Sequence, residues 1–152
     1  MKTLGEIQCR EEISNRLGLV RVDSHRRWGR MTAHQMVCHL SDSFRGVLGE
    51  KALASKPGTL GRGWMKWGAL YFPLRWPHGV PTIPEMNQEI GGTRPIEFNA
   101  DVSELRRLLE RFTRQPRDFT WGPHPIFGVM TEGDWMRWGY LHMDHHFRQF
   151  GV

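Results

Sequence analysis

Apolar side chains recur at helical spacing in four stretches of the chain, and polar residues occupy the positions between them. At 100° per residue, an amphipathic helix presents such a pattern as one apolar stripe. We therefore expect four helices, near residues 3–18, 32–50, 100–114 and 131–150. The stripe positions are Cys9, Ile13, Leu17 and Val20 in the first stretch, Met36, Val37, Leu40, Phe44, Val47 and Leu48 in the second, and Val102, Leu105, Leu108, Leu109 and Phe112 in the third.

Each expected helix starts with a capping-box pattern, in which a short polar side chain is followed three residues later by Glu, Gln or Asp. The two side chains of such a pair satisfy free backbone N–H groups in the first turn of a helix. Gly49 lies where the second helix should end, a position that glycine commonly takes. The four pairs are Thr3 with Glu6, Thr32 with Gln35, Asp101 with Glu104, and Thr131 with Asp134.

Residues 51–99 hold six of the nine prolines and show no sustained period of either kind. Within them, the segment GRGWMKWGALYF has helical spacing at Trp64, Trp67 and Tyr71, which predicts a short helix packed across the others. Strand patterns are scarce throughout. The chain is therefore expected to be all-α, a four-helix bundle with a long crossover between helices 2 and 3, and a single domain over residues 1–152.

The composition excludes several classes of protein. A chain of 152 residues, 39% of them hydrophobic, can bury a core without disulfides, and two cysteines are too few for a disulfide framework. No apolar run approaches the roughly 20 residues of a membrane span, and the N-terminal residues lack the apolar core of a signal peptide. We expect a soluble cytoplasmic protein with no membrane partner.

Basic residues exceed acidic ones, which gives a net charge of +5, and only four of the 21 basic residues are lysine. Arginine binds carboxylates and phosphates through two parallel hydrogen bonds, so this composition favours partners that carry such groups. The basic residues do not gather into the stripe that nucleic acid binding requires. We therefore expect no nucleic acid partner.

Two of the eight histidines, His142 and His146, are four residues apart on the fourth expected helix. They point in nearly the same direction and can bind one ion. Arg137, Asp144 and Arg148 fall nearly opposite, which indicates that the pair faces the core. Buried imidazoles need partners for their nitrogens, and a cation that accepts a lone pair from each is one solution. A hydrogen-bonded core pair and a solvent-filled cleft are the alternatives that the spacing leaves open.

A third ligand is expected from the second helix, which carries His34 and His39. Both lie roughly 110° from the centre of its apolar stripe, one on each flank, so periodicity does not choose between them. Cys38 points about 100° away from His39 and is expected to be a small core residue. Asp42, three residues after His39, is expected to be a solvated surface charge, and an acceptor that supports a metal ligand is the alternative. His145 is expected either to orient a ligand or to touch solvent at the edge of its helix.

Three stretches carry a family resemblance: WGRMTAHQMVCHL at 28–40, HPIFG at 124–128 and, most specifically, HMDHHFRQFG at 142–151. With them, nearly the whole chain resembles the DinB-like superfamily, and more narrowly an uncharacterised bacterial branch of it. The resemblance implies a four-helix bundle that holds a divalent metal with one histidine of the second helix and an HxxxH pair of the fourth. Position by position, the ligands fall on His39, His142 and His146, and His34 and His145 are not ligands.

The resemblance also implies a chemistry. Three neutral imidazoles leave open coordination positions, and zinc, nickel or iron suits such a site. Characterised members of the superfamily include transferases and isomerases that use low-molecular-weight thiols, and a bound cation keeps a thiol deprotonated. We expect a metal-dependent enzyme, a thiol-dependent S-transferase or isomerase with a small-molecule substrate. The alternative is a non-catalytic metal-binding bundle that acts through a protein partner or as a homodimer.

The aromatic residues of the crossover, near 59–76, are expected to cover the metal end of the bundle and to line a pocket. Trp64, Trp67, Tyr71 and Trp76 are too apolar to stay in water as one patch, and a pocket for an organic ligand needs apolar walls. We therefore predict that Trp64, Trp67 and Tyr71 bind the cofactor or substrate. A nucleic acid surface and a membrane surface are the alternatives.

Overall fold

The chain folds into helices joined by loops in a computed structural model that describes residues 1–54, 62–72 and 75–152. The all-α prediction is confirmed, because the described residues contain no β-strand. None of these helices is both long and apolar enough to cross a membrane. The elements are α1 (Ile7–Leu19), α2 (Ala33–Val47), α3 (Arg62–Tyr71), the 3-10 turn η1 (Pro84–Met86), α4 (Phe98–Thr113) and α5 (Glu132–Gln149).

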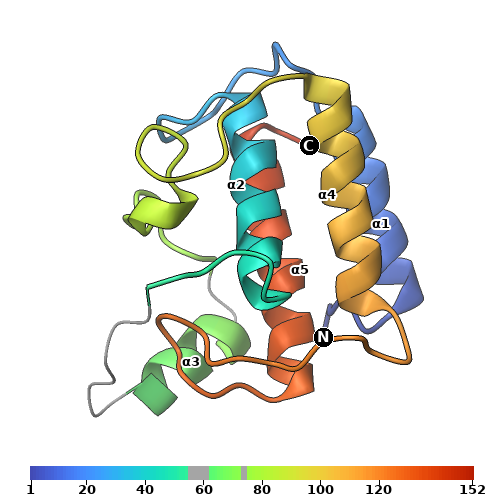
Figure 1. Ribbon diagram of the computed structural model, residues 1–152, viewed down its shortest axis with the longest axis vertical. Helices are drawn as coiled ribbons and strands as arrows, with labels where there is room; N and C mark the ends of the chain where they lie inside the picture. Colours follow the sequence, from blue (N-terminus) through green and yellow to red (C-terminus); the bar gives the residue numbers. More distant parts are fainter. Residues whose placement is uncertain (55–61, 73–74) are drawn as a thin grey trace.

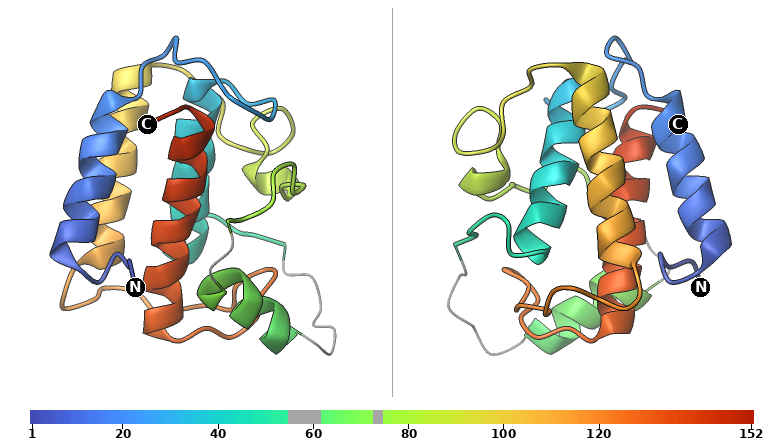
Figure 2. Two further views of the ribbon diagram at one scale, coloured as in Figure 1. Left: turned by 180° about the vertical axis from the view of Figure 1, so that it is seen from behind. Right: turned by 45° about the vertical axis from the view of Figure 1, so that its right-hand side comes forward.

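The four long helices lie side by side along the longest axis of the molecule (Figure 1). α2 packs against α4 and α5, and α1 packs against α5. The connection between α2 and α4 runs along the outside of these helices and contains α3 and η1 (Figure 2). α3 packs on α5 at one end of the group, and η1 packs on α2. The long crossover and its short helix thus occur where the sequence predicts them.

The predicted apolar stripes form the core between the helices. All their residues are buried except Val47 and Val102, which are half-buried. Phe44 of α2 and Phe112 of α4 meet edge to face, with ring centroids 5.0 Å apart. Helical periodicity therefore predicted correctly which face of α1, α2 and α4 turns inward.

Two of the four predicted capping boxes are present. The hydroxyl of Thr32 accepts from the backbone N–H of Gln35, whose side chain accepts in return from the N–H of Thr32, and Thr131 and Asp134 make the same exchange at the start of α5. α2 ends just before Gly49, whose φ of +75° is costly for other residues. The starts of α2 and α5 and the end of α2 are thus set by local signals.

The other two capping predictions are wrong. α1 begins without a side-chain cap, and the Thr3 hydroxyl accepts instead from the backbone N–H of Gly5. α4 begins at Phe98, because Glu97 accepts from the first free N–H groups of that helix. Asp101 consequently lies inside α4 and pairs with a side chain of α2, a partner that the local sequence does not reveal.

Candidate metal centre

Three histidines from two helices direct ring nitrogens at one point. His39 comes from α2, His142 and His146 come from α5, and one nitrogen of each lies within 4.8 Å of the others. The Nε2 atoms of His39 and His142 are 3.2 Å apart. His39 and His146 are buried, whereas His142 is half-buried. The structure thus brings together the three predicted ligands, and His39 rather than His34 is the member from α2.

Hydrogen bonds on the far side of two rings fix which nitrogen faces the group. The Met86 carbonyl can only accept, so His39 Nδ1, 2.9 Å away, carries the proton. Gln149 donates its amide to the Trp28 carbonyl at 2.9 Å, which turns its oxygen toward His146 Nδ1, also at 2.9 Å. His146 therefore donates from Nδ1 as well. Both rings, when neutral, present the lone pair of Nε2 to the group.

The contact of Gln149 with the loop before α2 requires a glycine. Gly29 has a φ of +78°, and a Cβ at this position would lie 2.5 Å from the Gln149 amide nitrogen. Glycine alone satisfies both the backbone conformation and the close approach. The same loop donates the backbone N–H of Arg27 to the carbonyl of Gln149 at 2.7 Å. The loop therefore fixes the residue that orients His146.

Burial keeps the three imidazoles neutral. Desolvation lowers the pKa of His39, although the hydrogen bond to Met86 partly offsets it. Desolvation, with the neighbouring rings, also holds the pKa values of His142 and His146 well below the ordinary 6.5. Neutral imidazole is the form that donates a lone pair to a metal ion. At neutral pH all three rings are therefore in that form.

The spacing of the nitrogens fits a divalent ion. Two nitrogens that each lie about 2.0–2.1 Å from a tetrahedral zinc ion are roughly 3.3 Å apart, and the Nε2 atoms of His39 and His142 are 3.2 Å apart. Two lone pairs at this distance repel unless a proton or a cation lies between them. The Nδ1 atom of His142 is buried and has no hydrogen-bond partner among the described residues. This ring, unlike the other two, is not held in one tautomer.

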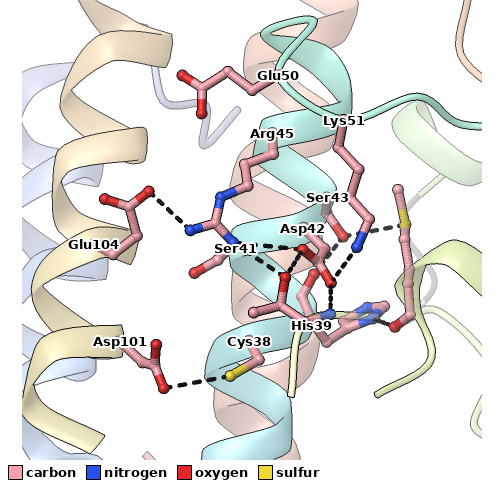
Figure 3. Close-up of polar contacts among 12 residues, drawn as sticks. Cys38, His39, Ser41, Asp42, Ser43, Arg45, Glu50, Lys51, Asp101 and Glu104 are labelled. Atoms are coloured by element: carbon pink, nitrogen blue, oxygen red, sulfur yellow. Dashed lines mark hydrogen bonds and ion pairs between the residues drawn. The ribbon is translucent and has the colours of Figure 1, made fainter. Parts of the chain in front are cut away.

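A buried carboxylate on α2 fastens the segment that carries Met86. Asp42 is fully buried and accepts from the backbone N–H and the hydroxyl of Thr93 at 2.7 and 2.6 Å. Lys51 Nζ lies 2.9 Å from it (Figure 3). Burial raises the pKa of Asp42, but these donors outweigh it and hold the pKa below its ordinary value. The prediction of a solvated surface charge is wrong, because the crossover folds over Asp42.

Two tryptophans border His142. The ring centroid of Trp138 lies 5.1 Å from that of His142, and that of Trp76 lies 6.0 Å from it. Trp138 is buried. Trp76 is thus the crossover aromatic that reaches the histidines, while residues 59–61 and 73–74 of the predicted covering segment lie outside the described residues.

Trp64, Trp67 and Tyr71 do not lie beside the three histidines. They belong to α3, where Tyr71 donates to Asp134 in the first turn of α5 at 2.5 Å, about 12 Å along the helix axis from His142. Trp64 and Trp67 are 74% and 59% exposed. Tyr71 thus covers the start of α5, and the binding of a cofactor or substrate by these three residues stays a prediction. Spacing identified a helix, but it could not tell which end of α5 that helix would cover.

His145 and His34 have their own neighbours. His145 is half-buried beside Trp28 and His78, which stack flat on each other with centroids 4.0 Å apart. Burial lowers the pKa of His145 to about 4. His34 Nε2 lies 2.6 Å from a carboxylate oxygen of Asp101 on α4. Neither residue belongs to the group that His39 forms with α5.

Sequence reasoning missed the residues that support the three histidines. Gln149 lies one helical turn after His146 within the quoted C-terminal motif, so this spacing could have identified it. Met86 acts through its backbone carbonyl, which any residue possesses, and Asp42 acts through a loop that is distant in sequence. The sequence carries no signal for Met86, and for Asp42 it does not reveal the contact with the loop.

Comparison with known protein families identifies the family to which the chain belongs. Residues 25–151 match the family described as "Protein of unknown function (DUF1569)". The match extends over α2 to α5 and includes the three histidines and their supports. No curated protein and no solved structure matches the chain. Because the match extends over most of its length, the chain belongs to this family of proteins of unknown function.

Proposed function

We propose that the protein binds one divalent metal ion through His39, His142 and His146, in a DinB-like four-helix bundle formed by its four long helices. The observation that carries this proposal is the convergence of three neutral imidazoles, two of which are held with Nε2 toward the others. Zinc, nickel and iron are the ions that suit three such nitrogens.

We further propose an enzymatic role, as a thiol-dependent S-transferase or isomerase with a small-molecule substrate. Three ligands leave the open position that is typical of catalytic sites. A divalent ion bound there lowers the pKa of a thiol or a water molecule beside it. The group contains no side-chain thiol or carboxylate. The nucleophile would therefore come from a co-substrate such as a low-molecular-weight thiol.

The surrounding side chains would orient the ligands and exclude water. Met86 and Gln149 hold two rings in the required tautomer, and such supports typically contribute 10–100-fold to metal affinity. Trp76 and Trp138 place apolar surface against His142. Walls of this kind favour a substrate with an apolar or planar portion.

Metal binding is tested with the His146→Ala variant and with His145→Ala as its matched control, because the two neighbours on α5 differ in whether they face the group. Dialysed proteins are titrated with Co²⁺ and followed by visible absorption. We expect His146→Ala to lose at least tenfold in affinity together with the metal-dependent rise in Tm, since an ion that binds only the folded state stabilises it. His145→Ala should keep both. Equal affinities and Tm values for His146→Ala and the wild type would contradict the proposal.

The thiol-dependent role is tested separately by adding 2-mercaptoethanol to the Co²⁺-loaded protein, in a Cys38→Ser background so that this protein thiol does not contribute. A thiol that enters the open position changes the visible spectrum. An unchanged spectrum would contradict the enzymatic role and leave the metal-binding proposal intact.

A second candidate function is a non-catalytic metal-binding protein that acts through a protein partner or as a homodimer. The exposed tryptophans of α3, Trp64 and Trp67, favour it, because large apolar side chains in water often mark an interface. Sedimentation of the wild type and of Trp67→Ala shows whether the chain forms a homodimer through these tryptophans. A monomeric wild type would contradict the homodimer.

A further inference from the structure

A second group of ligand-type side chains lies between α2 and α4. It consists of His34 and Cys38 of α2 and Asp101 of α4, and their ligand atoms lie within 4.8 Å of one another. His34 and Cys38 are four residues apart, so they share one face of α2. Figure 3 shows Cys38 directed at Asp101, whereas His39 is directed away toward η1. The two groups therefore occupy different sides of α2.

The separation of Cys38 and Asp101 suits a tetrahedral ion, and that of His34 and Asp101 must open to admit one. With bonds of about 2.3 Å to sulfur and 2.0–2.2 Å to oxygen, the two ligands of one zinc ion are roughly 3.6 Å apart. Cys38 Sγ lies 3.7 Å from Asp101 Oδ2. His34 Nε2 lies 2.6 Å from the same oxygen, where zinc requires roughly 3.4 Å. The side chains of His34 and Asp101 are 13% and 23% exposed, and binding an ion requires small rotations that open this distance.

The chemistry of the three side chains suits a divalent ion. Asp101 Oδ2 is in contact with His34, with Cys38 and with the backbone N–H of Ile96 at 3.4 Å, so three donors converge on one oxygen. The two positive charges of a divalent ion at this point would be balanced by the Cys38 thiolate and the Asp101 carboxylate. Imidazole, thiolate and carboxylate are all established ligands of zinc.

We propose that His34, Cys38 and Asp101 bind a second divalent ion, zinc or another ion that accepts thiolate, between α2 and α4. As the metal–sulfur bond forms, the Cys38 thiol releases its proton to solvent, and the ring proton of His34 moves from Nε2 to Nδ1, so that the ring binds the ion as a neutral imidazole. No electron is transferred. The partly exposed edge of the group lets a water molecule complete the four ligands. The ion links the first two turns of α2 to the first turn of α4 and uses none of the ligands of the proposed function.

Co²⁺ is the probe for this site, because thiolate ligation gives cobalt an intense near-ultraviolet charge-transfer band that histidine ligation does not give. Cys38→Ser removes the sulfur ligand. Cys9→Ser is the matched control, since Cys9 is also buried but lies on α1 and donates to Glu6 at 3.4 Å. We expect the band in the wild type and in Cys9→Ser. In Cys38→Ser we expect the band to disappear and the amount of bound Co²⁺ to fall by one equivalent.

Two further variants keep the test decisive. His34→Gln retains a hydrogen-bonding side chain opposite Asp101 and should weaken Co²⁺ binding at this site at least tenfold, which provides a result if Cys38→Ser fails to fold. His146→Ala should leave the thiolate band unchanged, so a failure of the proposed function is seen separately. A wild type without the band, or a Cys38→Ser protein with a band of wild-type intensity, would overturn the inference.

Discussion

The buried ring of His124 makes the stability of the protein depend on pH. Its Nδ1 atom accepts the backbone N–H groups of Ile126 and Phe127, each at 3.1 Å, so the proton of the neutral ring is on Nε2. The ring is 8% exposed and stacks on Phe127 with centroids 4.6 Å apart. A second proton would have to enter at Nδ1, where it faces two N–H groups. Burial lowers the pKa of His124 to about 4.

The sign and size of the effect follow from the two pKa values. In the unfolded chain a histidine titrates near 6.5, so below that pH the unfolded state binds more protons and stability falls as the pH falls. The loss extends from about pH 6.5 down to about pH 4, where the folded state also takes up the proton. Between pH 7 and pH 5, His124 alone should remove about 2 kcal/mol from the free energy of unfolding.

His124→Asn isolates this contribution, because an asparagine oxygen accepts the same two backbone N–H groups but does not titrate. Urea unfolding of the wild type and the variant is followed by circular dichroism at both pH values, with a chelator present. The variant loses ring packing at every pH, so only the change with pH is compared. The wild type should lose about 2 kcal/mol more than His124→Asn. Equal losses in the two proteins would refute the argument that His124 is held neutral.

Two further predictions concern the supports of the histidines. Asp42→Ala should destabilise the protein by about 3–5 kcal/mol in urea unfolding, because it leaves buried donors such as those of Thr93 without a partner; a loss below about 1 kcal/mol would contradict this. Gly29→Ala should cost about 1–3 kcal/mol through backbone strain, and it should weaken Co²⁺ binding because the new methyl group displaces Gln149 from His146. An unchanged Co²⁺ affinity would show that the loop does not support the metal site.

The sequence by itself determined the features that depend on neighbours within a few turns. The apolar stripes of α1, α2 and α4 were predicted correctly, since helical geometry fixes which residues share a face. The capping boxes at Thr32 and Thr131 were also predicted correctly, because each joins two residues that are only three positions apart. His142 and His146 share one face of α5 because they are four residues apart, whatever surrounds the helix.

The tertiary structure alone decided which distant residues meet. Periodicity left His34 and His39 equivalent, and only the packing of α2 against α4 and α5 sent one to Asp101 and the other to His142. Asp42 is likewise buried only because the crossover folds over it. Spacing along a helix gives an angle around its own axis, but it gives neither the position along a neighbouring helix nor the partner across it. Those depend on how long connections close, which is why α3 covers the start of α5 and not its histidines.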